Sequence, residues 1–416
     1  MAESNVLGIL CASGFSVYLR GFSAIDSLLD RDSGTGLFVL TNADTADLAR
    51  LFEALRFPGI GLADAALDSE KHVFYFQCAD SEKAAESGAS ELGHPFPAPD
   101  RRPSFRLLEF YQDYKTRNFY DPRGIYPMLA GFRQTGRSKD MAGAADILGD
   151  INTGIERTQA LTDAALILAR YFPADRETER HIGKTAVLFR DLQKGYAPGK
   201  EEQRLLLTGL LTSPNPCLGF EFLKRSGFIG EFWPELAVLD DVDHSKEFHP
   251  EGNAWKHTME TFRYRKAGLR DSYDLLLSMG LLLHDTGKPI AGAAGSRRFD
   301  GHAELGEVQA RLFLERLGYS APLINDVCYL VRNHMLTAAL PRLPLFRTGE
   351  IMASSLFPVL LELYRCDESS SFKGLDGYYE SSAAYQQYLR YRRNPYRSAD
   401  GKKLNKTQMI GITHAR

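Results

Sequence analysis

Histidine and aspartate side chains at the ends of apolar segments are the residues of this sequence best suited to chemistry. His284 and Asp285 end an apolar run over residues 275–283, and Gly287-Lys288-Pro289 then stops the predicted helix, 273–284. This helix is apolar on nearly every side and should be buried, where an unpaired charge costs roughly several kcal/mol. A metal cation is the most favourable partner for a neutral imidazole beside a carboxylate.

Two residues far away in the sequence could complete such a site. His257 lies on the preceding predicted helix, and Asp367 ends another apolar helix that covers residues 356–363. Together with His284 and Asp285, they would direct nitrogen and oxygen ligands from separate helices into a helical bundle. This pattern resembles the HD superfamily of metal-dependent phosphohydrolases.

Two further histidines fit the extended version of that pattern. His302 follows Phe-Asp-Gly and His334 follows Arg-Asn, and both surroundings resemble the HD domain attached to bacterial CCA-adding enzymes and poly(A)-polymerase-like proteins. The resemblance covers about residues 245–370. It implies two metal sites that share one carboxylate. The first would consist of His257, His284, Asp285 and Asp367, and the second of Asp285, His302 and His334.

The resemblance implies hydrolysis of a phosphoester. A metal held by Asp285 would lower the pKa of bound water toward neutrality, and the hydroxide would attack phosphorus. Lys288 and Arg332 would stabilise charge on the equatorial oxygens, and Arg297 and Arg298 would add a positive rim. One or two ions of Fe, Mn, Co, Ni or Zn suit these ligands better than Mg.

The first 140 residues are predicted to form a small α/β domain. Strand-like runs cover residues 15–21, 36–43 and 72–77, and a helix follows the second run, with Thr45 as its N-cap. The order of these segments resembles the nucleotidyltransferase head of CCA-adding enzymes. In that family, a Gly-Gly turn precedes an Arg-Asp pair, and an Asp-x-Asp pair of metal ligands precedes Thr-x-Ala.

The positions that carry the chemistry of that head differ in this chain. Thr41-Asn42-Ala43 matches the Thr-x-Ala motif, which places the two carboxylate positions at Gly36 and Phe38. The glycine pair reads Gly21-Phe22, and only Asp26 remains of the Arg-Asp pair. Glycine and phenylalanine side chains cannot bind Mg²⁺, and two-metal nucleotidyl transfer needs carboxylates there. We therefore expect a degenerate, inactive head.

The remainder of the chain is predicted to be mostly helical, which gives an α+β fold class. Residues 141–245 show helical spacing and correspond to a neck, although the family's Glu-Asp-x-x-Arg motif is not evident there. Residues 246–370 would form the HD helical bundle. Residues 371–416 form a basic, Tyr-rich helix and tail, whose Tyr and Arg side chains suit RNA bases and phosphates as well as a helix docked on the bundle.

Composition limits the classes of protein to consider. A hydrophobic content of 44% and a charged content of 25% are typical of a globular protein, and a net charge of −3 excludes binding of nucleic acid through bulk charge. Five scattered cysteines without zinc-type spacing indicate reduced thiols. With no apolar run near the ~20 residues of a membrane span and no basic leader, we expect a cytoplasmic protein.

The sequence therefore favours a metal-dependent phosphohydrolase that descends from a CCA-adding enzyme and has lost nucleotidyl transfer. Its substrate would be a phosphomonoester or a 2′,3′-cyclic phosphodiester on a nucleotide or an RNA end. Two alternatives remain open. One is a tRNA- or RNA-binding protein with a structural metal site, and the other is a tRNA CCA- or poly(A)-nucleotidyltransferase whose carboxylates lie at unrecognised positions.

Overall fold

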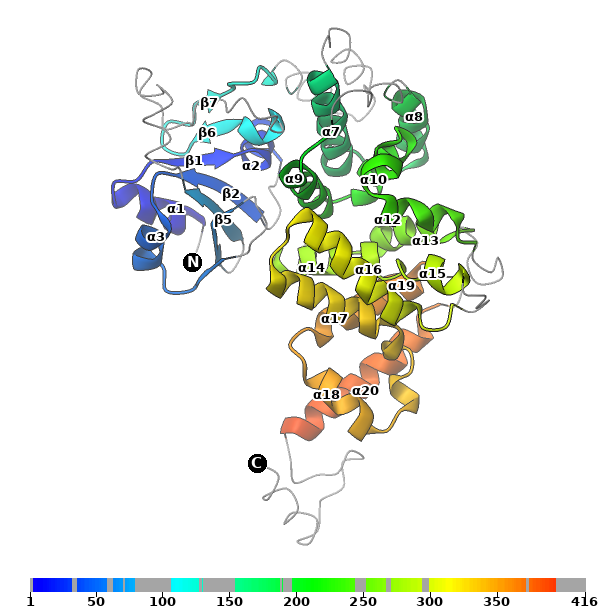
Figure 1. Ribbon diagram of the computed structural model, residues 1–416. Coiled ribbons are helices and arrows are strands. Elements are labelled where there is room, and N and C mark those ends of the chain that lie inside the picture. The colour runs from blue at the N-terminus through cyan, green and yellow to red at the C-terminus, as the bar shows by residue number, and fades with distance from the viewer. Residues whose placement is uncertain are drawn as a thin grey trace. The chain divides into compact units, whose positions relative to one another are not determined.

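The computed structural model has an α+β fold, with a small mixed sheet near the N-terminus and a helical remainder (Figure 1). It describes residues 3–31, 36–57, 63–69, 72–78, 106–126, 129, 154–187, 189, 197–243, 252–266, 271–293, 299–371 and 374–393. The chain divides into two compact units. Unit 1 contains residues 1–237, 266–278 and 312–324, and unit 2 contains residues 238–265, 279–311 and 325–416.

The sheet of unit 1 has seven strands in the order β3-β4-β5-β2-β1-β6-β7. At its centre, β2 runs parallel to β5 and antiparallel to β1. The described elements of this region are α1 (Glu3–Ala12), β1 (Val17–Arg20), α2 (Phe22–Leu28), β2 (Gly36–Thr41), α3 (Thr45–Leu51), β3 (Leu55–Arg56), β4 (Ala65–Asp68), β5 (Val73–Cys78), the 3₁₀ helix η2 (Arg106–Glu109), β6 (Tyr111–Asp113) and β7 (Phe119–Tyr120).

The three predicted strands are confirmed to within two residues at each end, because their apolar runs supply side chains that are buried in the sheet. On β2, for example, Leu37 and Val39 are 2% and 1% exposed. The predicted cap of the following helix is wrong by one residue. Asp44, rather than Thr45, caps α3, because its carboxylate accepts from the Asp47 N–H while the Asp47 carboxylate accepts from the Asp44 N–H.

Helices complete unit 1. They are α7 (Gly154–Tyr171), α8 (Arg176–Val187), α9 (Lys200–Leu211), α10 (Pro216–Arg225), α11 (Phe228–Phe232) and α12 (Pro234–Ala237). Their core includes Trp233, which is fully buried and whose indole N–H donates to Gln203. The Trp233 ring also contacts Phe228 and Phe313, at centroid distances of 5.2 and 6.3 Å.

The helices that carry or flank the predicted metal ligands, and those that pack around them, reach or lie in unit 2. They are α13 (Ala254–Thr261), α14 (Asp271–Leu283), α15 (Lys288–Ala293), α16 (His302–Leu317), α17 (Ala321–Thr337), α18 (Leu345–Ala353), α19 (Phe357–Ser369) and α20 (Asp376–Arg393), with the 3₁₀ helices η3 (Val238–Asp241), η4 (Phe262–Tyr264) and η5 (Leu340–Arg342). Within the described ranges, no helix combines the length and apolar character that a membrane span needs.

The buried position of α14 is confirmed, since Met279 and residues 281–283 are completely inaccessible. Gly280 allows close packing here, because an added Cβ would lie 2.8 Å from a methyl group of Leu363 and 3.1 Å from one of Leu330. The predicted helix end at His284 is correct to within one residue, since α14 ends at Leu283, but Lys288 and Pro289 begin a new helix, α15. The loop predicted over residues 291–299 is therefore wrong for its first three residues.

Candidate metal centre

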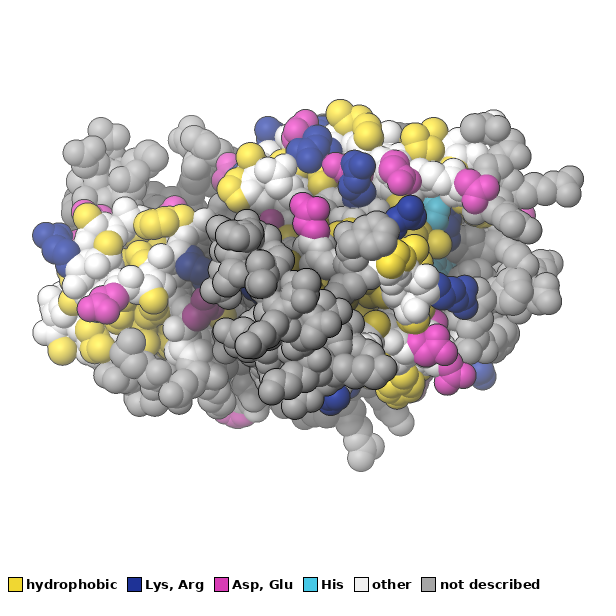
Figure 2. Space-filling view, turned by 90° about the horizontal axis from the view of Figure 1, so that it is seen from below, with side chains coloured by type: hydrophobic (Ala, Val, Ile, Leu, Met, Phe, Trp, Pro, Cys, Tyr) yellow, Lys and Arg dark blue, Asp and Glu magenta, His cyan; other side chains and the backbone are white. Residues whose placement is uncertain are grey.

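Six predicted ligands lie together in unit 2, although they come from five places in the sequence. Potential ligand atoms fall into two groups, each within 4.8 Å: His257, His284 and Asp367, and then Asp285, His302 and His334. Five of the six residues are buried, and the Asp367 side chain is 25% exposed. Accordingly, the face shown in Figure 2 displays only small areas of histidine surface, beside Lys or Arg and hydrophobic side chains.

Local backbone contacts orient the imidazole rings. The Nδ1 atoms of His284, His302 and His334 lie 2.7–2.9 Å from the carbonyl oxygens of Leu281, Phe299 and Val331, which in each case are three residues earlier. A carbonyl oxygen only accepts, so each Nδ1 carries the proton and each Nε2 presents a lone pair to the cluster.

His257 is held by a side chain instead of a carbonyl group. The Ser370 hydroxyl donates to the backbone oxygen of Asp367 at 2.6 Å, so its oxygen can accept from His257 Nδ1 at 3.2 Å. The fourth imidazole therefore also turns Nε2 inward, where it lies 2.9 Å from Asp367 Oδ1. Ser370 is a supporting residue that the sequence reasoning missed, although it follows Asp367 by three positions on a helix.

The ring orientations leave acceptor atoms facing one another. His302 Nε2 and His334 Nε2 are 3.1 Å apart, and neither can donate when both rings carry their proton on Nδ1. His284 Nε2 is buried and has no hydrogen-bond partner among the described residues. Opposed lone pairs and an unsatisfied buried nitrogen are unfavourable unless a cation lies between them, so the donor set fits a divalent metal.

Asp285 joins the two groups. Its Oδ2 atom lies 3.3 Å from His284 Nε2 and 3.9 Å from His257 Nε2, whereas its Oδ1 atom lies 3.7 Å from His302 Nε2. Lys288 Nζ donates to Oδ2 at 2.7 Å. Burial raises the pKa of Asp285, but the adjacent His284 imidazole and the Lys288 ammonium group outweigh this effect and hold the pKa well below its usual value. Asp285 is therefore an anion.

Burial acts in the opposite direction on the histidines. It lowers the pKa of His302 and, more strongly, lowers the pKa of His334 to about 3. The pKa of Asp367 is below its usual range, because contact with His257 outweighs the effect of burial. Neutral imidazoles beside ionised carboxylates are the protonation states that a metal requires of its ligands.

The backbone at Gly287 leaves no room for a side chain. A Cβ added to Gly287 would overlap the carbonyl oxygen of His302 and lie 2.5 Å from the Gly306 nitrogen. The chain just after Asp285 thus touches the first turn of α16 directly, backbone against backbone. This contact sets the distance between Asp285 and His302.

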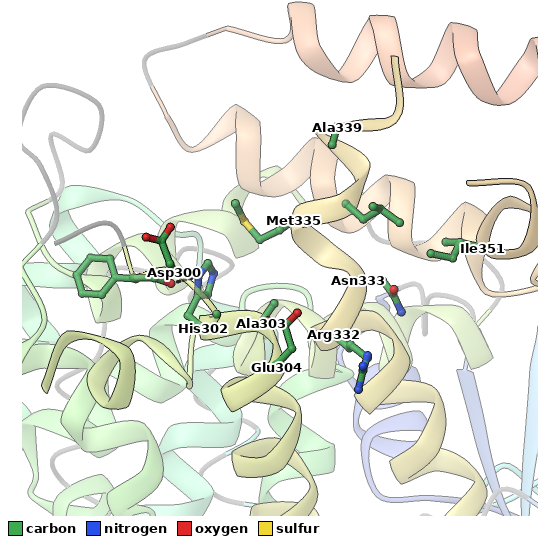
Figure 3. Close-up of a pocket in the computed structure, with 12 residues that line it drawn as sticks. Asp300, His302, Ala303, Glu304, Arg332, Asn333, Met335, Ala339 and Ile351 are labelled. Carbon is green, nitrogen blue, oxygen red and sulfur yellow. Dashed lines mark hydrogen bonds between the residues drawn. The ribbon is translucent and has the colours of Figure 1, made fainter. Parts of the chain in front are cut away.

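A cavity of about 440 Å³ borders the second group (Figure 3). Its lining is formed by two loops and by parts of α16, α17 and α18: residues 299–304, 332, 333, 335, 336, 339 and 351. His302 belongs to this lining, and Figure 3 shows Met335 lying above it. Arg332 also lines the cavity, but its guanidinium donates to Glu307 at 2.7 Å and its side chain is 58% exposed.

The structure thus places Lys288, but not the Arg332 guanidinium, in contact with a predicted ligand. The catalytic roles predicted for Asp285, Lys288 and Arg332 stay predictions. Arg297 and Arg298, together with the basic tail from residue 394, lie outside the described residues.

The two head positions at which the sequence predicted a loss of carboxylates, Gly36 and Phe38, lie in the first half of β2. Gly36 pairs with Val73, and the Phe38 ring stacks on Tyr75 at a centroid distance of 5.1 Å. The Asp26 carboxylate is not free, because side chains of α7 pair with it. Arg170 and Tyr171 of α7 donate to its carboxylate, and the Asp26 side chain is 2% exposed. These two partners, 144 and 145 residues away, could not be found from the sequence.

Known proteins similar to this chain fall into two kinds, and the first concerns the helical cluster. Residues 255–352 match the family model of the HD domain. This range holds five of the six clustered residues, and Asp367 lies beyond its end. The predicted HD domain is therefore confirmed.

The second kind concerns longer stretches of the chain than the HD domain. The CC-adding tRNA nucleotidyltransferase of Thermus thermophilus is 28% identical over 299 residues, which are 67% of this chain and 68% of that protein. The A-adding tRNA nucleotidyltransferase of Deinococcus radiodurans is 27% identical over 195 residues, or 45% and 44% of the two chains. A solved complex of a CCA-adding enzyme with ATP is 13% identical and covers 98% of this chain and 88% of its own, with a TM-score of 0.34.

These relatives overturn the functional expectation drawn from the sequence. The phosphohydrolase or cyclic phosphodiesterase with an inactive head is wrong as the leading interpretation, because the relatives that match beyond the HD domain are named for nucleotide addition to tRNA. The physical reason for the error is that a metal cluster was equated with hydrolysis. The geometry of the ligands shows where an ion fits, whereas the reaction depends on which substrate and which other groups contact that ion.

Proposed function

We propose that this protein acts on the 3′ end of tRNA as a tRNA nucleotidyltransferase. The observation that carries the proposal is the similarity to the CC-adding enzyme of Thermus thermophilus, which extends over about two thirds of both chains. In nucleotidyl transfer, the terminal hydroxyl of the RNA attacks the α-phosphorus of a nucleoside triphosphate, and pyrophosphate leaves. An α+β head followed by helices is compatible with this assignment.

A divalent metal at the helical cluster is the second part of the proposal. His257, His284, Asp285 and Asp367 would hold one ion, and Asp285, His302 and His334 would hold a second. When bound, such ions offset the buried carboxylate charges and cross-link the helices that bear the ligands. The support is the inward orientation of four Nε2 atoms, which a backbone or hydroxyl contact fixes in each ring.

The head favours a second candidate function, tRNA binding without nucleotide transfer. Phe38 stacks on Tyr75 where the resembling family has a metal-binding carboxylate. Asp44 and Asp47, which follow the other end of β2 in the sequence, serve as the capping pair of α3. Transfer by this head would need carboxylates from elsewhere in the chain, whereas RNA binding would not.

One experiment distinguishes these functions. Purified protein is incubated with α-labelled CTP or ATP, and with tRNA transcripts that lack the last one, two or three nucleotides. Filter binding is measured on the same RNAs, and a hairpin of equal length serves as the control RNA. Labelled product refutes the binding-only candidate. Binding that prefers the truncated tRNA, with no labelled product, refutes nucleotidyl transfer, and the absence of both refutes any role at the tRNA end.

A further inference from the structure

The first half of helix α20 contacts the C-terminal ends of α17 and α19, the helices that carry His334 and Asp367. The Ser381 hydroxyl donates to the backbone oxygen of Thr337 at 2.7 Å, and both residues are buried. The Thr337 hydroxyl in turn donates to the backbone oxygen of His334 at 2.5 Å. A two-step hydrogen-bonded path therefore joins α20 to the turn that presents His334.

A second path runs through the end of α19. Glu368, which follows Asp367 directly, accepts from the Tyr378 backbone N–H at 2.6 Å and from the Tyr364 hydroxyl at 2.9 Å. An added Cβ at Gly377 would overlap the Glu368 carboxylate, which shows how closely α20 approaches this turn. The first turn of α20 is thus fixed by the turn that presents Asp367.

These contacts are confined to the first half of α20. Further along, Tyr385 packs on Phe357 at a centroid distance of 4.5 Å, and Phe357 lies at the opposite end of α19 from Asp367. This aromatic contact in the second half of the helix therefore lies at the end of α19 that is remote from the ligand turns. This difference within one helix provides an internal comparison.

We infer that Ser381 and Glu368 couple the first half of α20 to the metal cluster, so that docking of α20 and occupancy of the cluster stabilise each other. The two paths end on His334 and Asp367, which belong to different ligand groups. A metal that fixes these side chains also fixes the carbonyl and carboxylate acceptors next to them. By thermodynamic reciprocity, loss of the α20 contacts lowers the affinity for metal by the same factor. Ser381 is thus a positioning residue, and the inference rests on the proposed metal site.

The first test is the metal affinity of Ser381→Ala, measured by competition with a chromophoric chelator using Co²⁺ or Mn²⁺. Loss of one buried hydrogen bond should weaken binding by about 3- to 10-fold. Ser382→Ala is the matched control, because it removes a partly exposed hydroxyl one residue along the same helix and should leave the affinity unchanged. Equal affinities in the two variants would overturn the inference.

The second test needs no mutation. Hydrogen exchange is followed for residues 376–384 and 385–393 in full-length protein, with metal and after chelation. Chelation should speed exchange in the first segment by about 10-fold and change the second less. Equal changes in both segments, or none, in a sample that binds metal would refute the coupling and leave the metal site standing. A sample with no measurable metal binding would refute both.

Discussion

Replacement of Gly287 by alanine tests the geometry of the cluster most directly. The new Cβ would overlap the carbonyl oxygen of His302 and approach the Gly306 nitrogen to 2.5 Å. Both neighbours are backbone atoms, which cannot rotate aside as a side chain can. Relief therefore requires that the first turn of α16 move by roughly 1 Å, and such overpacking usually destabilises by about 1–3 kcal/mol.

That movement would displace the metal ligands. His302 Nε2 lies 3.7 Å from Asp285 Oδ1, and a metal between such atoms tolerates displacements of only about 0.5 Å. We expect Gly287→Ala to lose most of the ion held by Asp285, His302 and His334. The ion held with His257 should be affected less, because α13 does not take part in the contact.

Elemental analysis of metal-loaded protein and thermal unfolding together provide the assay. Gly349→Ala on α18 is the matched control, since nothing lies within 4 Å of its added Cβ. That control should keep its metal content and gain up to about 1 kcal/mol of stability, because alanine favours a helix over glycine. A Gly287→Ala protein that binds as much metal as the parent and unfolds at the same temperature would refute the close-contact argument.

The remaining predictions concern single groups. Asp285→Asn should abolish metal binding at both sites, since the Asp285 oxygens face both ligand groups. The control Asp326→Asn, at a partly buried acid, should keep the metal, and elemental analysis measures the metal content of both variants. Asp26→Asn leaves the Arg170 guanidinium buried without a counter-charge and should lower stability by about 3–5 kcal/mol in urea unfolding, and a loss under about 1 kcal/mol would contradict that role. Burial raises the pKa of Cys78 to about 12, so its alkylation by iodoacetamide should be far slower at pH 8 than that of free cysteine and should rise about tenfold per pH unit up to pH 10. Mass spectrometry follows the alkylation, and a rate like that of free cysteine would contradict the raised pKa.

The named relatives, and not the geometry of the metal cluster, overturn the phosphohydrolase interpretation. The sequence supplied both the phosphohydrolase interpretation and the nucleotidyltransferase alternative, and the named relatives support the alternative. Gly36 and Phe38 remain the features that a nucleotidyltransferase assignment has to explain. Because Phe38 packs on Tyr75, any transfer activity must use carboxylates at other positions.

Local features of this protein were determined by the sequence alone. The apolar run before His284 predicted a buried helix, and the carbonyl groups that orient three of the imidazoles lie only three residues before them in the chain. Such contacts join neighbours in the chain, so a local pattern suffices to encode them. Tertiary structure alone decided that His257 meets Asp367, that Arg332 turns to Glu307 and that Arg170 neutralises Asp26. These pairs depend on how helices pack and on which backbones can touch, as Gly287 and Gly306 do, and spacing along the chain does not contain that information.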